Sequence, residues 1–170
     1  MPRNIEIKAR IPSVEHLLPQ ARAVADTQPV LIEQDDTFFA VRHGRLKLRV
    51  FDDGSGELIH YHRPDGSEAR ASDYVRVPVP DPAALREALE RGCGLLGRVR
   101  KQRWLLLAGA TRIHIDRVEG LGDFMELEVV LQDGQSDAEG VAIAEALMQA
   151  LGLGAAPRVA GAYMDLLARA

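Results

Sequence analysis

The chain has 170 residues, of which 46% are hydrophobic and 27% charged, so it fits one domain with a normal core and excludes disordered, collagen-like and coiled-coil classes. Its 21 Lys and Arg against 25 Asp and Glu give a net charge of −4, which argues against a surface devoted to nucleic acid or anionic lipid. Cys93 is the only cysteine, so an intrachain disulfide and a multi-cysteine metal centre are excluded.

These bulk properties lead us to expect a single domain over residues 1–170, located in the cytoplasm. A lone cysteine fits a reducing compartment. No apolar run follows Met1, and no later stretch approaches 18 uncharged apolar residues, so neither a signal peptide nor a membrane span is predicted.

Residues 3–11 alternate between polar and apolar side chains. Asn4, Glu6, Lys8 and Arg10 occupy the even positions, and isoleucine or alanine occupies the odd positions from residue 5 onward. This period of two predicts a strand with one apolar face.

A helix and three strands are predicted next. Ser13 is a suitable N-cap for a helix to about Asp26, which Pro19 is expected to kink or restart because proline removes an internal donor. Turn residues then separate three strands that form a β-meander, over residues 30–41, 45–51 and 57–63.

The middle of the chain combines a strand with a helix. A short strand is predicted over residues 73–79. Asp81 as N-cap and Pro82 at the first position then begin a helix that ends at residue 92 or 94. The packing stripe of this helix is expected to comprise Ala84, Leu85, Ala88 and Leu89.

The last part of the chain predicts three long strands and one or two helices. The strands cover residues 96–108, 111–119 and 122–131, and their short connections make antiparallel neighbours. Ser136 and Glu139 form a capping box for a helix to about Leu151, and residues 161–168 predict a last short helix. About eight strands with hairpin-length turns indicate an α+β class with a largely antiparallel sheet, and eight strands can close into a barrel.

Cations repeat at alternate positions of three predicted strands. They are Arg45, Lys47 and Arg49 in one strand, Lys101 and Arg103 in another, and Arg63, two residues after Tyr61, in a third. Same-face neighbours lie roughly 6–7 Å apart, so each pair repels by about 0.6 kcal/mol in water but about 2–3 kcal/mol at an effective dielectric near 20. Enclosure of these faces would therefore favour an anionic ligand.

Carboxylates follow a similar pattern. Glu126 and Glu128 share one face of a late strand, Asp116 follows His114 by two residues on the preceding strand, and Glu6 lies on the first strand. Carboxylate oxygens suit Mg²⁺ or Mn²⁺, which retain waters and bridge to substrate phosphates, so two or three protein ligands are enough.

A simpler interpretation is that the charged side chains lie on the solvent-exposed face of an antiparallel sheet whose other face is buried. Periodicity alone does not say whether the charged faces meet. From periodicity alone, the charged faces could either enclose an anion and a metal ion or be exposed to solvent.

At these positions the sequence resembles the CYTH superfamily, also called triphosphate tunnel metalloenzymes. The family carries an N-terminal ExExK motif, which here reads NIEIK, with Asn4 in place of the first glutamate. The other matching segments are LKLRV, HRPD, RKQRW and HIDRVEGLGDFMELEVV. The last segment resembles class IV adenylyl cyclases more than the other branches of the superfamily.

The resemblance covers nearly the whole chain and implies a closed eight-stranded antiparallel β-barrel, with helices packed outside and polar strand faces around a triphosphate and Mg²⁺ or Mn²⁺. The metal ligands that it implies are Glu6, Glu126, Glu128 and Asp116. The phosphate-binding residues that it implies are Lys8, Lys47, Arg49, Arg63, Lys101 and Arg103. The catalytic residues that it implies are Glu6, Lys8, Glu126 and Glu128. Asn4 is expected to weaken one metal position, because a neutral amide is a weaker ligand for a hard cation.

Three functions follow from the resemblance. The first is a class IV adenylyl cyclase-like enzyme that converts ATP to cyclic AMP and pyrophosphate. The second is a triphosphatase acting on inorganic tripolyphosphate, thiamine triphosphate or a nucleotide, and the third is a non-catalytic triphosphate or polyphosphate-binding protein. Related enzymes are often dimers, so a homodimer is the expected assembly, with neither nucleic acid nor membrane as a partner.

Four other polar residues are given structural roles from the sequence. His114 shares the charged parity and is expected to line the barrel or to be paired. Asp36 could face the lumen ahead of packed aromatic residues. Arg76 is expected to be a solvated charge, and Tyr163 is expected to anchor the C-terminal helix to the barrel.

Overall fold

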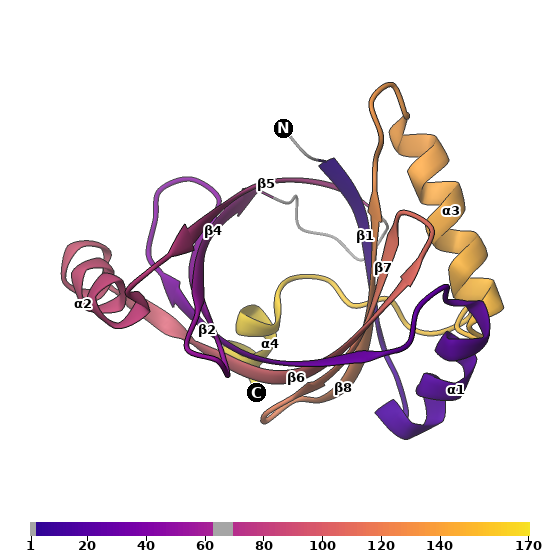
Figure 1. Cartoon of the computed structure of the whole chain (residues 1–170), viewed down its shortest axis with the longest axis horizontal. Coiled ribbons are helices and arrows are strands. Elements are labelled where there is room, and N and C mark those ends of the chain that lie inside the picture. The colour runs from indigo at the N-terminus through magenta and orange to yellow at the C-terminus, as the bar shows by residue number, and fades with distance from the viewer. Residues whose placement is uncertain (1–2, 63–69) are drawn as a thin grey trace.

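The computed structural model describes residues 3–62 and 70–170, and within these ranges the chain forms eight strands and four helices (Figure 1). The strands are β1 (Arg3–Arg10), β2 (Val30–Phe39), β3 (Arg45–Phe51), β4 (Gly56–His62), β5 (Arg70–Val79), β6 (Leu95–Ala108), β7 (Thr111–Val118) and β8 (Gly122–Val130). The helices are α1 (Val14–Val24), α2 (Pro82–Cys93), α3 (Asp137–Ala150) and α4 (Tyr163–Arg169).

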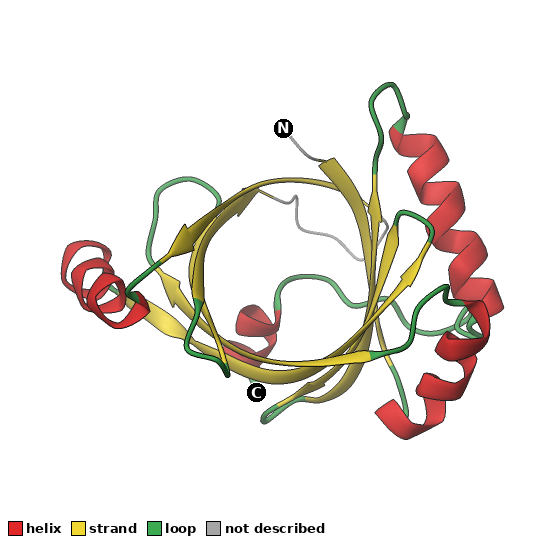
Figure 2. Cartoon of the chain, viewed as in Figure 1, coloured by secondary structure: helices red, strands yellow, loops and turns green. Residues whose placement is uncertain are grey.

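All of these strands belong to one closed barrel. Their order is β1-β5-β4-β3-β2-β6-β7-β8, and every neighbouring pair is antiparallel. The pairs β1–β5, β2–β6 and β1–β8 join strands that are distant in sequence and complete the ring (Figure 2). The predicted α+β class with a closed eight-stranded antiparallel β-barrel is confirmed.

The larger of the two hydrophobic clusters lies outside the barrel wall and thereby fixes which strand faces point inward. Ile5 and Ile7 of β1 and Met125 and Leu127 of β8 are buried in one cluster with residues of α1 and α3. Successive side chains of a strand point to opposite faces, so the even-numbered residues of β1 and β8 point into the barrel. Each buried aliphatic side chain contributes about 1.5–3 kcal/mol, so a one-residue slip of either strand would be costly. The interpretation of these charged faces as the wet side of an open sheet is therefore wrong.

Two helices differ in detail from the prediction. Helix α1 continues through Pro19, which lies on its exposed side, where water can solvate the carbonyl left without a donor. In α2, Leu85 and Leu89 are half-buried whereas Ala84 and Ala88 are exposed, so the packing stripe is narrower than expected. No helix in the described ranges is both long enough and apolar enough to cross a membrane.

Helix α4 departs from purely external packing. Its first residue, Tyr163, is buried and lines the barrel cavity together with Ala162. Asp165 of the same helix accepts hydrogen bonds of 2.9 and 2.6 Å from Arg45, at the start of β3. Tyr163 therefore forms part of the cavity wall, beyond the anchoring role that the sequence predicts for it.

Candidate functional site

The inside of the barrel is a charged cavity of about 790 Å³, including open solvent at its mouth. All eight strands contribute inward-facing residues to its wall. Among the described residues that line it, seven are cationic: Lys8, Lys47, Arg49, Arg76, Lys101, Arg103 and Arg112. Four are carboxylates: Glu6, Asp36, Glu126 and Glu128. The described wall thus has a surplus of three positive charges.

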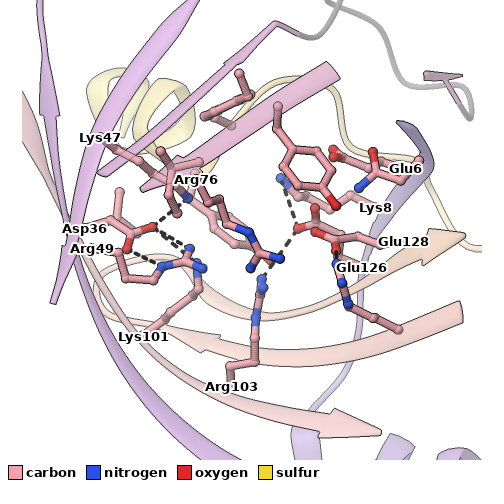
Figure 3. A pocket seen from close by; sticks show the side chains of 18 of the residues that line it. Glu6, Lys8, Asp36, Lys47, Arg49, Arg76, Lys101, Arg103, Glu126 and Glu128 are labelled. Carbon is pink, nitrogen blue, oxygen red and sulfur yellow. Dashed lines mark hydrogen bonds and ion pairs between the residues drawn. The ribbon is translucent and has the colours of Figure 1, made fainter. Parts of the chain in front are cut away.

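Most of the predicted site residues meet in this cavity (Figure 3). Those that line it are Glu6, Lys8, Lys47, Arg49, Lys101, Arg103, Glu126 and Glu128. Arg63 lies outside the residues that the structure describes. Asp116 is fully buried against Arg103 and is not among the carboxylates grouped closely enough to share a metal ion.

One side of the cavity is built around Asp36 of β2. Its carboxylate accepts hydrogen bonds of 2.7 and 2.8 Å from Arg49 and one of 2.8 Å from Lys47, and Lys101 Nζ lies 3.8 Å away. Asp36 is directly opposite Arg49 in the β2–β3 register, so strand pairing sets this contact. We call Asp36, Lys47, Arg49 and Lys101 the Asp36 cluster.

The Asp36 cluster contains more positive than negative charge. Burial raises the pKa of Asp36, but Arg49, Lys47 and Lys101 outweigh burial and hold that pKa well below its usual range. Burial, together with the charge of Arg49, lowers the pKa of Lys47, and burial with the charge of Arg103 lowers the pKa of Lys101 well below its usual value. The part of these pKa shifts that comes from Arg49 and Arg103 would be offset by an anion beside the lysines.

Glu6, Glu126 and Glu128, which we call the carboxylate trio, lie on the opposite side of the cavity in Figure 3. One oxygen of each lies within 4.8 Å of those of the other two. Glu6 is directly paired with Glu128 between β1 and β8, and Glu126 is two residues along the same strand face. Asn4 lines the same cavity, and the trio forms without a carboxylate at that position.

Cations surround the carboxylate trio. Arg112 donates a hydrogen bond of 3.1 Å to Glu128, and the side-chain nitrogens of Lys8 and Arg103 lie 3.8 and 3.7 Å from Glu126. Burial raises the pKa of Glu128, but the neighbouring imidazole and guanidinium groups outweigh burial, so its pKa is lowered. The carboxylate of Glu128 is therefore ionised at neutral pH, as coordination of a hard cation requires.

Arg103 of β6 lies between the Asp36 cluster and the carboxylate trio (Figure 3). It donates two hydrogen bonds, of 2.7 and 2.6 Å, to Asp116, which is directly opposite it on β7. Tyr163 donates a hydrogen bond of 2.7 Å to the same carboxylate. Because a bidentate arginine–carboxylate pair fixes the guanidinium plane, Asp116 positions Arg103 at the cavity wall.

The Asp116 carboxyl is expected to titrate far below the usual range. Burial raises its pKa, but the charge and hydrogen bonds of Arg103 outweigh burial and lower it from 3.8 to about 2. A lowered folded-state pKa stabilises the fold above about pH 4, and this contribution of about 2 kcal/mol is lost as the pH falls towards 2. Carbon-13 NMR of the carboxyl group should give a midpoint near 2. A midpoint near 3.8 would show that the buried pair does not form.

His114 of β7 points to the inner side of the barrel, as predicted, and is only 4% exposed. It is directly opposite Glu126 in the β7–β8 register. Burial lowers its pKa to about 4, with the charge of Arg103 acting in the same direction, so the imidazole is neutral at neutral pH. Its Nδ1 atom lies 3.9 Å from Glu128 Oε1 and has no hydrogen-bond partner.

Sequence reasoning leaves some cavity residues without a functional role. Asp36 shares its strand parity with Phe38, and Arg112 shares the parity of His114, so alternation could have identified both. Arg76, expected to be solvated, is half-exposed and also lines the cavity. Tyr163 reaches the cavity from a helix, so no strand periodicity points to it.

Comparison with known proteins supports this fold. A family model described as CYTH domain matches residues 2–163, and no curated protein sequence matches the chain. The solved PH1012 protein from Pyrococcus horikoshii OT3 is 24% identical, with a TM-score of 0.86 over 96% of this chain and 99% of that one. A candidate adenylate cyclase from Vibrio parahaemolyticus is 20% identical, with a TM-score of 0.80 over 97% of each chain. Another, from Bacillus halodurans, is 13% identical, with a TM-score of 0.56 over 95% of this chain and 96% of that one.

Proposed function

This chain belongs to the CYTH domain family, whose model matches nearly all of it, and we propose that it is a metal-dependent enzyme acting on a triphosphate bound in the barrel cavity. One observation carries the proposal: a cavity wall with a surplus of three positive charges lies beside a group of three carboxylates. The cations can bind phosphate oxygens, and the carboxylates can hold a divalent ion that also binds the substrate phosphates.

The cationic residues would bind and orient the phosphates. Like charges about 6 Å apart repel by about 3 kcal/mol at an effective dielectric near 20. A bound triphosphate would attract these cations and so outweigh their mutual repulsion. Arginine suits forked contacts to phosphate oxygens, and lysine suits point-charge contacts. The proposed phosphate ligands are Lys8, Lys47, Arg49, Lys101 and Arg103, with Arg63 retained from the sequence and Arg76 and Arg112 added from the cavity wall.

The carboxylate trio fits a hard divalent ion. Its oxygens are close enough to share one ion, and Mg²⁺ and Mn²⁺ keep waters that leave room for substrate oxygens. When bound, such an ion neutralises charge that develops on phosphate oxygens and aligns the reacting groups. Asp116, which the resemblance implies as a further ligand, is not in the trio, and we propose that it acts by holding Arg103 in place.

The reaction we propose is that of a class IV adenylyl cyclase. The 3′-hydroxyl of ATP attacks the α-phosphorus, a cyclic ester forms, and pyrophosphate and a proton leave. Lys47, Arg49 and Arg103 would stabilise the charge that grows on the pyrophosphate, so no covalent nucleophile is needed. Support comes from the HIDRVEGLGDFMELEVV segment and from two structural relatives named as candidate adenylate cyclases.

Aromatic residues of the same cavity favour a nucleotide over a bare triphosphate. Phe38, Tyr61 and Tyr74 line the wall beside the cations. Their faces and edges offer apolar area to a purine base, which inorganic tripolyphosphate lacks. Hydrolysis of tripolyphosphate or thiamine triphosphate would use the same cations and carboxylates, so triphosphatase activity is the second candidate.

The test is a product assay with purified protein and Mg²⁺ or Mn²⁺, in which ATP, tripolyphosphate and thiamine triphosphate are supplied separately. We expect cyclic AMP and pyrophosphate in equal amounts from ATP. Orthophosphate without cyclic AMP would replace the cyclase with a triphosphatase. Metal-linked binding without turnover of any substrate would overturn the enzyme proposal and leave a triphosphate-binding protein.

Asp36→Asn is expected to make folding depend on an anionic ligand. The change leaves Lys47, Arg49 and Lys101 buried without their carboxylate, which should cost about 3–5 kcal/mol of unfolding free energy. Tripolyphosphate should restore most of this loss, and it should stabilise the variant more than the wild type. Thermal melts with and without tripolyphosphate measure both effects, with exposed Asp133→Asn as the control. Equal ligand-induced shifts in variant and wild type would contradict a phosphate site at the Asp36 cluster.

A further inference from the structure

We propose that Tyr163 is a positioning residue for triphosphate binding, whose ring holds the side chains of Lys8 and Lys101 in the cavity and leaves N–H groups of both for the phosphates. The inference rests on the proposed function, because it requires that a triphosphate binds in the barrel. It goes further in giving the C-terminal segment a part in binding and in naming the residue through which that segment acts.

The chain contains three lysines, Lys8, Lys47 and Lys101, and all three line the cavity. Lys47 donates a hydrogen bond of 2.8 Å to Asp36. The ion pairs of Lys8 with Glu126 and of Lys101 with Asp36 are longer, at 3.8 Å each, which is beyond hydrogen-bonding distance. These two ion pairs therefore direct the ammonium groups less closely than the hydrogen bond of Lys47 does.

The ring of Tyr163 lies beside both Lys8 and Lys101. Its centroid is 4.1 Å from Lys8 Nζ and 5.3 Å from Lys101 Nζ. An ammonium group within about 6 Å of an aromatic centroid is attracted to the ring face, and more strongly where water is excluded. All three residues are buried, so both contacts form in such a place.

Two contacts fix the ring of Tyr163 itself. Its hydroxyl donates a hydrogen bond of 2.7 Å to Asp116, and its ring packs edge-on against Phe124, with centroids 5.0 Å apart. Burial and the charge of Asp116 raise the pKa of the Tyr163 hydroxyl well above its usual value, so the ring is neutral at neutral pH. The ring is therefore a fixed, uncharged support.

The backbone of the C-terminal segment, which leads into α4 in Figure 1, contacts Lys8 as well. Lys8 Nζ donates a hydrogen bond of 3.1 Å to the carbonyl of Gly161, and the Val159 N–H donates one of 2.9 Å to the carbonyl of Lys8. The ion pair between Asp165 and Arg45 holds α4 against β3. The segment thus reaches Lys8 through its backbone and through the ring of Tyr163.

Neutral partners position a lysine without cancelling its charge. A carboxylate such as Asp36 subtracts one unit from the positive charge that a triphosphate meets, whereas a ring and a carbonyl subtract none. Burial and the charge of Arg103 lower the pKa of Lys101, and a bound anion would offset the part that comes from Arg103, which favours the ammonium form in the complex. Side chains that are held in advance also lose less freedom when the ligand binds.

Tyr163→Leu and Tyr163→Phe separate the ring from the hydroxyl. Tyr163→Leu lacks the ring and should bind tripolyphosphate about 10-fold more weakly, whereas Tyr163→Phe keeps the ring and should bind within about threefold of the wild type. Met164→Leu is the matched control, because Met164 packs against Gly97 and does not line the cavity. Titration calorimetry measures these affinities, and thermal melts check that each variant folds.

A fluorinated ring replaces Tyr163→Leu if that variant does not fold. Pentafluorophenylalanine at position 163 keeps the shape of the phenylalanine ring but reverses its quadrupole, so it repels a cation at the ring face. Compared with Tyr163→Phe, it should bind tripolyphosphate about 10-fold more weakly.

Nuclear magnetic resonance of protein labelled with ¹³C at the lysine ε-carbon gives a readout that lost stability alone would not move. Three lysines give three signals, which single Lys→Arg changes assign. The ε-protons of Lys8 and Lys101 should show the ring-current shift of Tyr163 in the wild type and in Tyr163→Phe, and should lose it in Tyr163→Leu. The signal of Lys47, which Asp36 holds, should stay where it is.

The outcomes separate this inference from the proposed function. Wild-type affinity in Tyr163→Leu, or lysine signals that do not respond to loss of the ring, would overturn the role of Tyr163 and leave the triphosphate site intact. Equal weakening in Tyr163→Phe and Tyr163→Leu would assign the effect to the hydrogen bond with Asp116 and contradict the inference. A wild type that binds neither tripolyphosphate nor ATP would overturn the proposed function, and the inference with it.

Discussion

Glu126→Gln is expected to lower metal-dependent turnover at least a hundredfold, with little loss of stability. Glutamine removes one anionic oxygen ligand from the carboxylate trio, and loss of a metal ligand or a charge-stabilising group typically costs about 10²–10³ in rate. Stability should change by only about 1 kcal/mol. Lys8 and Arg103 approach Glu126 at 3.8 and 3.7 Å, and the variant also relieves repulsion with Glu128.

The measurement pairs kinetics with metal affinity. Turnover at saturating substrate, the dissociation constant for Mn²⁺ and urea unfolding should be recorded for the wild type, Glu126→Gln and Glu128→Gln. Glu90→Gln on the exposed surface of α2 provides the matched control and should leave all three quantities unchanged. Full turnover in Glu126→Gln and Glu128→Gln would remove the trio from the mechanism.

Arg103→Met is expected to weaken triphosphate binding and to destabilise the fold at the same time. A charge-assisted hydrogen bond contributes about 1.5–3 kcal/mol, so the dissociation constant should rise about 10–100-fold. The change also leaves Asp116 buried without its guanidinium partner, which should cost about 3–5 kcal/mol of unfolding free energy.

A second substitution separates the two effects. In Arg103→Met/Asp116→Asn the buried charge is gone, so much of the stability should return while triphosphate affinity stays low. Arg98→Met is the control, because Arg98 is an exposed arginine of the same strand that pairs with Asp35 outside the cavity. Titration calorimetry and urea unfolding measure the two quantities. Recovery of triphosphate affinity in the double variant would show that Arg103 acts only through stability.

Local sequence patterns predict the strands well but not how the barrel closes. Residues 45–51 were predicted as a strand, and β3 spans Arg45–Phe51. Alternation gives the two faces of each strand, because the side-chain period is fixed at two residues. It does not give the distant pairings β2–β6 and β1–β8, which depend on cross-strand packing, and here the resemblance to a family supplied the closed barrel.

In the candidate site, too, the sequence predicts which residues share a strand face but not which residues of different strands are in contact. Lys47 and Arg49 could be predicted as a pair on one face, but their shared contact with Asp36 requires the β2–β3 register. Asp116 illustrates the converse. The resemblance implies that it is a metal ligand, but only the strand register shows that its direct partner on β6 is Arg103, with which it forms an ion pair. Tyr163 enters the cavity through the path of the C-terminal segment, on which strand alternation gives no information.

The structure changes how much the replacement of a glutamate by Asn4 is expected to matter for metal binding. From the sequence, replacement of a glutamate at this position is expected to weaken metal binding. In the structure, Asn4 is buried in the cavity wall, while Glu6, Glu126 and Glu128 form a group of three without it. Under the proposed function these three carboxylates hold one divalent ion, so the proposed site does not depend on a glutamate at position 4.

A crystal structure with a non-hydrolysable ATP analogue and Mn²⁺ tests the central claim most directly. We predict the triphosphate inside the barrel, with phosphate oxygens at Lys47, Arg49 and Arg103 and the ion at Glu6, Glu126 and Glu128. The base should lie against the aromatic wall formed by Phe38, Tyr61 and Tyr74. An analogue bound outside the barrel, or an empty cavity at saturating analogue and Mn²⁺, would contradict the account.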